Sequence, residues 1–194
     1  MKPRTLTLVA VAATTALVAA ACGKKKQHDP VNYSAPVGIT LNVKSGDVVA
    51  GVIDENKNIN TESGNPFGAF VNSAKAALGG HDPSSVALES LTLSITSNGT
   101  GVTSLAQIFN GPVTISFQMN SGTGLYPAAT ANNPTGTNAA FTEIFDSTDL
   151  PDADYAQFLG GQFKVLLHGS AATAIQTTSF NVDLVSTFVF SAFQ

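Results

Sequence analysis

The chain has 194 residues, with nine lysine and arginine residues, thirteen aspartate and glutamate residues and a formal net charge of −4. Beyond residue 30 it carries four lysines, no arginine and twelve acidic residues, for a formal charge of −8. Nucleic-acid phosphates are bound by clustered lysine and arginine, so this charge excludes a nucleic-acid-binding function. Residues 31–194 are enough for one domain with a sizeable core.

The first 21 residues have the pattern of a cleaved secretory signal peptide. Lys2 and Arg4 precede an apolar run that ends in three alanines at residue 21. A membrane-spanning helix would need about 20 apolar residues. The run is shorter and contains Thr14 and Thr15, so a retained helix is the weaker alternative.

Cys22 is the only cysteine, so no intramolecular disulfide can form. It directly follows the alanines at 19–21, and this arrangement resembles the lipobox of bacterial lipoprotein precursors over residues 1–26. The resemblance implies that a peptidase cuts before Cys22 and that Cys22 carries the acyl chains. Gly23, in place of the Asp that retains such proteins at the inner membrane, implies the outer membrane if the cell has one. Ordinary secretion is the alternative.

We therefore expect residues 1–21 to be a signal peptide, residues 22–36 a lipid-anchored tether and residues 37–194 a single domain. More than one acyl chain would make membrane attachment stable. The lysines at 24–26 would add attraction to anionic head groups, or would be a plain polar spacer.

Alternating apolar and polar residues predict several strands separated by turns. The expected strands are 37–43 and 48–53, paired as a hairpin, then 86–96, 113–119, 163–168 and 180–192. The apolar residues of the strand 86–96 change from one face to the other near Glu89 and Ser90, which predicts a bulge. The length of the last strand predicts a bend or a bulge near Val185 and Ser186. Short helices are expected at 66–78, 105–109 and after Pro151. The fold class is mainly β: an antiparallel β-sandwich, Ig-like or jelly-roll-like, with two or three short helices, or alternatively a partly open barrel.

The segment 54–65 is expected to be a polar loop and is a weak candidate for a calcium site. Asp54, Asn56, Asn58 and Asn60 match positions 1, 3, 5 and 7 of a calcium-binding loop. Ile59 stands where such a loop needs glycine. The alternative, which fits better, is an asparagine-rich connection without metal.

Four acidic residues cluster in the segment 146–154: Asp146, Asp149, Asp152 and Asp154. Paired carboxylates could catalyse glycoside hydrolysis, so an envelope hydrolase is the alternative function. The better interpretation makes Asp149 a helix cap, with Pro151 in the first helical turn.

Other polar residues predict structure rather than chemistry. His81 and Asp82 are expected in a loop at 81–85 as turn or cap residues, and His168 is expected on the outward face of its strand. The segment 120–138 is expected to be a long loop, either mobile or a contact surface. With no catalytic cluster, the sequence favours a lipid-anchored envelope protein with a non-enzymatic binding or assembly role, attached to the membrane through Cys22 and contacting an envelope protein partner.

Overall fold

The computed structural model describes residues 33–60, 64–96, 100–122 and 124–194. These residues form nine strands, three short α-helices and three 3₁₀ turns. The strands are β1 (Tyr33–Lys44), β2 (Val48–Val49), β3 (Val52–Ile59), β4 (Ser85–Ile95), β5 (Phe109–Met119), β6 (Leu125–Asn132), β7 (Asn138–Glu143), β8 (Phe163–Ala171) and β9 (Asn181–Phe193). The helices are α1 (Pro66–Ala77), α2 (Leu105–Ile108) and α3 (Asp152–Leu159). No helix in the described residues is long and apolar enough to span a membrane.

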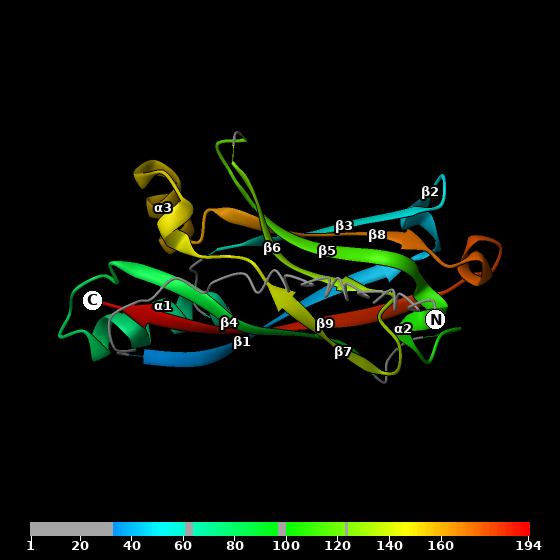
Figure 1. Cartoon of the computed structure of the whole chain (residues 1–194), viewed down its shortest axis with the longest axis horizontal. Coiled ribbons are helices and arrows are strands. Elements are labelled where there is room, and N and C mark those ends of the chain that lie inside the picture. The colour runs from blue at the N-terminus through cyan, green and yellow to red at the C-terminus, as the bar shows by residue number, and fades with distance from the viewer. Residues whose placement is uncertain (1–32, 61–63, 97–99, 123) are drawn as a thin grey trace, which may run out of the picture.

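The described strands form one antiparallel sheet in the order β1-β9-β4-β7-β6-β5-β8-β3-β2, which curls into two facing layers (Figure 1). β7 is the strand that joins the layers. It pairs with β4 through residues 138–141 and with β6 through Thr142 and Glu143. This sandwich-like, mainly β architecture with three short helices confirms the predicted fold class.

The domain starts earlier than expected, because β1 begins at Tyr33 rather than at Val37. The strand pairs with β9 along its whole length, from Tyr33 opposite Ala192 to Lys44 opposite Asn181. The Tyr33 ring lies 5.9 Å from the ring of Phe70 in α1. Residues 33–36 therefore belong to the sheet, and β1 enters it at the end that carries α1 and α3 (Figure 1).

The predicted first hairpin is wrong. The tight hairpin joins β2 to β3 around Ala50 and Gly51, whose φ angles of 51° and 79° are both positive. Positive φ at both central residues matches the turn that suits the twist of a two-residue hairpin. β1 instead pairs with β9, which lies more than 130 residues later in the chain.

Two segments that were expected to be loops are strands. β3 continues through Ile59 and pairs with β8, so most of the predicted 54–65 loop is sheet. β6 occupies the middle of the predicted 120–138 loop and pairs with β5, with a register shift between Ile115 and Ser116. Asparagine and alanine at these positions disfavoured a strand assignment from propensity, but pairing with a long neighbouring strand overrides that weak preference.

The predicted bulge in β4 is confirmed, since the pairing of β4 with β9 shifts between Leu88 and Ser90. A bend or a bulge was expected near Val185 and Ser186, and the bulge is absent, because β9 pairs there with both β1 and β4 without a register shift. The elongated sandwich accommodates the strand at full length (Figure 1). Ser186 is fully buried, and its Oγ has no hydrogen-bond partner among the described residues.

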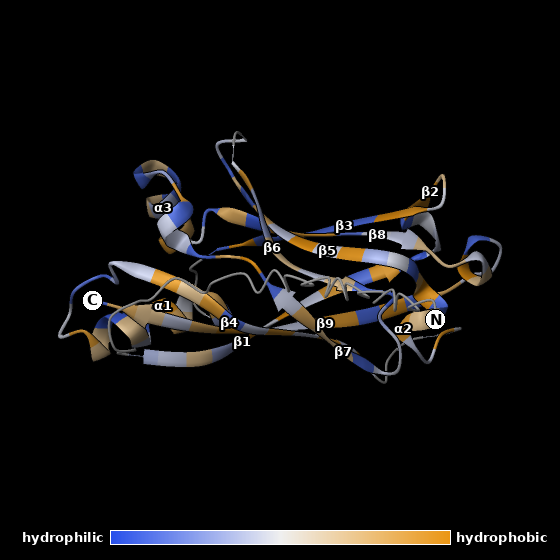
Figure 2. Cartoon of the chain, in the orientation of Figure 1, coloured by the Kyte–Doolittle hydropathy of each residue, from blue (hydrophilic) through white to orange (hydrophobic). Residues whose placement is uncertain are grey.

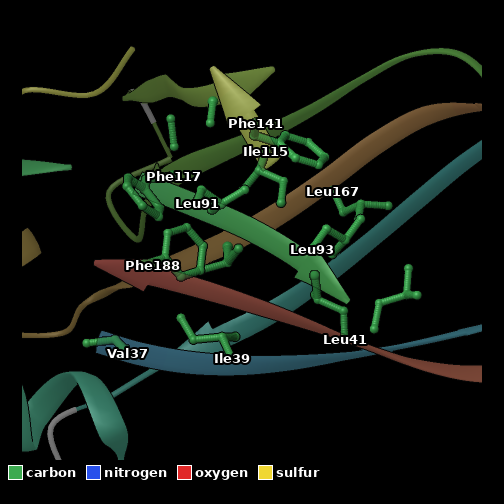
Figure 3. Close-up of a cluster of buried hydrophobic side chains, with 14 of the residues drawn as sticks. Val37, Ile39, Leu41, Leu91, Leu93, Ile115, Phe117, Phe141, Leu167 and Phe188 are labelled. Atoms are coloured by element: carbon green, nitrogen blue, oxygen red, sulfur yellow. The ribbon is translucent and has the colours of Figure 1, made fainter. Parts of the chain in front are cut away.

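Apolar and polar residues alternate along many of the strands (Figure 2). The apolar strand residues are mostly buried, so each layer turns its apolar face to the other. Figure 3 shows side chains from both layers meeting in this core, among them Ile39 and Leu93 from one layer and Ile115 and Leu167 from the other. Toward the end with α1 and α3, the core becomes aromatic. The ring of Phe117 lies 5.4 to 5.7 Å from the rings of Phe158, Phe163 and Phe188.

We expect Phe158→Ala to lower the free energy of unfolding by about 3–5 kcal/mol, because it removes a fully buried ring that α3 contributes to this cluster. Ile144→Ala is the control, since Ile144 is 53% exposed and its truncation should cost less than about 0.5 kcal/mol. Urea denaturation measures both. Similar losses for the two variants would contradict the role of Phe158 in joining α3 to the core.

Candidate functional site

A groove with a volume of about 510 Å³ lies between α1 and α3 at one end of the sandwich. Its lining comes from α1, from the segment that leads into β4, and from α3 with the glycine that follows it. The lining residues are Val71, Asp82, Pro83, Asp152, Tyr155, Ala156, Leu159 and Gly160. A volume of this size is typical of sites for small ligands or a few side chains.

The two helices that form the groove are held together beneath it. The Asn65 side chain caps α1 by accepting a hydrogen bond of 2.9 Å from the Phe67 N–H, and Pro66 occupies the first turn. This cap and the following helix confirm the prediction for α1. The buried ring of Phe67 then lies 5.0 Å from that of Phe158 in α3, in an edge-to-face arrangement. The groove is therefore built on a packed aromatic base.

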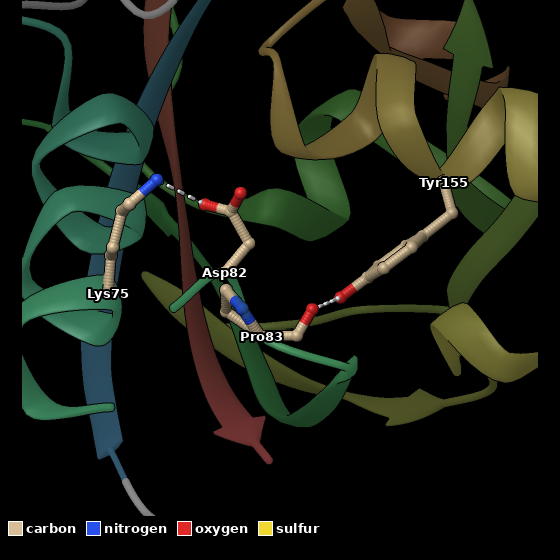
Figure 4. Close-up of polar contacts among 4 residues, drawn as sticks. All are labelled: Lys75, Asp82, Pro83 and Tyr155. Atoms are coloured by element: carbon tan, nitrogen blue, oxygen red, sulfur yellow. Dashed lines mark hydrogen bonds and ion pairs between the residues drawn. The ribbon is translucent and has the colours of Figure 1, made fainter. Parts of the chain in front are cut away.

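Tyr155 closes one side of the groove. Its hydroxyl donates a hydrogen bond of 2.6 Å to the Pro83 carbonyl oxygen, which links α3 to the segment before β4 (Figure 4). Burial raises the pKa of Tyr155 well above its ordinary value of 10.0, a hydrogen bond with Ser147 lowers it, and the nearby Asp82 carboxylate raises it. Tyr155 is consequently neutral at physiological pH and acts as a hydrogen-bond donor.

Asp82 and Lys75 form an ion pair of 2.9 Å between α1 and the same segment (Figure 4). Their side chains are 63% and 46% exposed, so the pair contributes at most about 1 kcal/mol. It serves to place one carboxylate and one ammonium group at the rim. The predicted loop at 81–85 is confirmed for residues 81–84, with His81 exposed, while Ser85 already begins β4.

The acidic segment 146–154 is arranged differently from the prediction. Pro151, not Asp149, is the N-cap residue of α3, and Asp146 caps a separate 3₁₀ turn by accepting from the Thr148 N–H at 2.8 Å. Asp152 lies in the first turn of α3 and lines the groove. Asp154 is buried and accepts a hydrogen bond of 2.5 Å from the Tyr126 hydroxyl.

The contact between Tyr126 and Asp154 ties the β5–β6 hairpin to α3. The hydrogen bond to Asp154 raises the pKa of Tyr126 above its ordinary value, as do burial and the Asp154 charge. A Cβ atom on Gly124 would lie 2.5 Å from both the Asp154 Oδ2 and the Tyr126 ring, so only glycine fits beside this pair. The carboxylates of Asp146 and Asp154 both accept hydrogen bonds that stabilise the local structure. The alternative that the acidic segment belongs to a hydrolase stays a prediction.

The loop geometry proposed for calcium is absent. β3 carries Asp54, Asn56 and Asn58 as alternate, exposed residues on one of its faces. Successive members of this set are about 6.6 Å apart along the strand, so their side chains do not converge on one cation. Asn60 instead accepts a hydrogen bond from Asn65 at 3.2 Å. The described residues contain no group of three His, Cys, Asp or Glu side chains that could hold a metal ion.

His168 lies on the outward face of β8, as predicted, with its side chain 64% exposed. Its Nδ1 is 2.5 Å from Oδ1 of Asp54, the residue directly opposite it on β3. The sequence analysis missed this pair because it assigned Asp54 to a loop. Residues 54–58 are polar at every position, so no alternation of apolar and polar residues signalled a strand there.

Cys22, the signal peptide and the tether residues up to 32 lie outside the described residues. No protein-family model matches the chain, and no curated protein matches it. Function is therefore inferred from the sequence pattern at the N-terminus and from the chemistry of the groove.

We expect the free energy of unfolding to fall as the pH rises above about 10, because the raised pKa of Tyr155 makes the folded state bind its proton more tightly than the unfolded state does. Below pH 10 this contribution is fully present. Tyr155→Phe should cost about 0.5–1.5 kcal/mol at pH 8, through loss of the bond to Pro83, and should make the alkaline decline shallower.

The measurement is urea denaturation at pH values from 8 to about 11.5. Tyr33→Phe is the matched control, because the Tyr33 hydroxyl makes no hydrogen bond to another described residue, and it should keep the alkaline decline of the wild type. An unchanged decline in Tyr155→Phe would contradict the assignment.

Proposed function

We propose that this protein is a lipid-anchored cell-envelope protein with a non-enzymatic binding or assembly role, and that the groove between α1 and α3 is its contact site. The observation that carries the proposal is that two polar groups of the groove are engaged in structural contacts. The Tyr155 hydroxyl and the Asp82 carboxylate are both engaged in contacts that build the walls. A preformed, mostly apolar surface with its polar groups in structural bonds suits binding rather than nucleophilic chemistry.

The position of the domain's start supports a membrane-proximal groove. Tyr33 contacts Phe70 in α1, and Val71, the next residue, lines the groove. The segment 22–32, fully extended at about 3.3–3.6 Å per residue, would place Tyr33 at most about 40 Å from an acylated Cys22. A partner in the same membrane would be within reach of the groove, at the high effective concentration that tethering provides.

The anchor is tested by metabolic labelling with a palmitate analogue and by detergent phase partition of the full chain expressed in bacteria. We expect the wild type to be labelled and to enter the detergent phase, and Cys22→Ala to do neither. Lys26→Gln, which leaves Cys22 in place, should behave as the wild type does. An unlabelled wild-type protein would overturn the anchor.

The contact site is tested by cross-linking in cells, followed by purification of the full chain from membranes. We expect the wild type to recover a defined partner that Ala156→Trp does not, because the indole would fill the groove next to Leu159. Ala76→Trp is the matched control: it places the same ring at an exposed position of α1 outside the groove. Recovery of the partner by Ala156→Trp, or its loss in both variants, would contradict the groove as the contact site.

A further inference from the structure

We infer that the groove between α1 and α3 binds a short, extended peptide segment in which a lysine or arginine is flanked by apolar residues. This inference rests on the proposed binding role and names the chemistry of the partner. Four features of the described residues carry it: the shape of the groove, its walls, the packing beneath it and the charge on its rim.

The groove follows the length of α3. Asp152, Ala156 and Gly160 are spaced four residues apart, so they form one stripe along the helix that rises about 12 Å at 1.5 Å per residue. A peptide in extended conformation covers the same length with about four residues at 3.3 Å each. An elongated ligand therefore matches this groove better than a compact one.

The walls are apolar. Val71 from α1, Leu159 from α3 and Pro83 from the segment before β4 line the groove. Apolar side chains of a peptide would lose water against these walls, at about 25 cal/mol for each Å² that becomes buried. The aliphatic stem of a lysine or arginine can use the same surface while its charged head stays at the rim.

The groove is formed before a ligand arrives. The contact of Phe67 with Phe158 holds the two helices at their base, and the bond from Tyr155 to Pro83 holds the segment before β4 against α3. Binding would therefore not require these elements to be ordered, and little of the interaction energy would be lost to conformational entropy.

The rim favours a cation. Asp82 and Asp152 reach the groove from different elements, whereas Lys75 is the single cation that contacts either of them in the described part of the chain. Asp152 forms no ion pair with another described residue. Since residues beyond 30 carry a formal charge of −8, the surrounding field also attracts a basic partner and repels an acidic one.

A metal ion does not meet these conditions, because no described cluster of His, Cys, Asp and Glu side chains is large enough to hold one. Asp82 already pairs with Lys75, so Asp152 is the rim carboxylate that a cation of the ligand would meet beside the apolar walls. Lysine and arginine side chains within an apolar segment combine both properties in one chain.

The test uses isothermal titration calorimetry with the full-length chain in phosphatidylcholine nanodiscs and with empty nanodiscs as the blank. The probes are acetyl-Leu-Lys-Ala-Leu-amide and the two peptides in which Gln or Glu replaces Lys. We expect the lysine peptide to bind about tenfold more tightly than the glutamate peptide, with the glutamine peptide in between.

Two variants locate the binding. Asp152→Asn should weaken binding of the lysine peptide by about two- to fivefold, as expected for an exposed ion pair, and Ala156→Trp should abolish it. Asp183→Asn is the control for net charge: it removes the same charge from β9, outside the groove, and should leave the affinity within about twofold.

The inference is overturned if the lysine peptide does not bind, if the three peptides bind alike, or if Asp183→Asn weakens binding as much as Asp152→Asn. Such a failure is distinguishable from failure of the proposed function. A labelled Cys22 and a partner recovered by the wild-type chain would keep the envelope binding role, while the absence of peptide binding would remove only the basic segment as its ligand.

Discussion

The aromatic packing at one end of the sandwich is the contact on which the rest of the structure depends. Phe117 and Phe163 come from one layer and Phe188 and Phe190 from the other, and Phe158 of α3 packs among them. Each large ring removes much apolar surface from water, and the edge-to-face pairs add about 0.5–1.5 kcal/mol beyond that burial. The same cluster thus joins the two layers and holds the helices in place.

This packing also creates the groove. Phe67 and Phe158 bring α1 and α3 together at their bases, while smaller residues above them, such as Val71 and Ala156, leave space between the helices. Tyr155 and Asp82 then use their polar atoms to hold the third wall. A surface formed in this way is rigid, largely apolar and acidic at its edge, and these properties suit recognition of a partner with complementary charge.

Several features could be predicted from the sequence because they depend on local chemistry. The helix cap at Asn65 and Pro66, the bulge near Glu89 and the buried alternation of β5 all follow from side-chain periodicity and backbone preference. Propensity failed at β3 and β6, where polar and small residues were assigned to loops. These segments are strands because neighbouring strands pair with them through hydrogen bonds. The residues of one segment do not reveal which other segments will lie beside it.

The sequence by itself determined the mainly β class, the short helices and the acidic charge, since each follows from residue type and spacing. Only the tertiary structure decided which strands pair and which side chains meet. β1 with β9, Asp54 with His168 and α1 with α3 are all separated by long stretches of chain. Their contacts result from the packing of the whole core, because apolar burial drives segments together without specifying partners by local pattern.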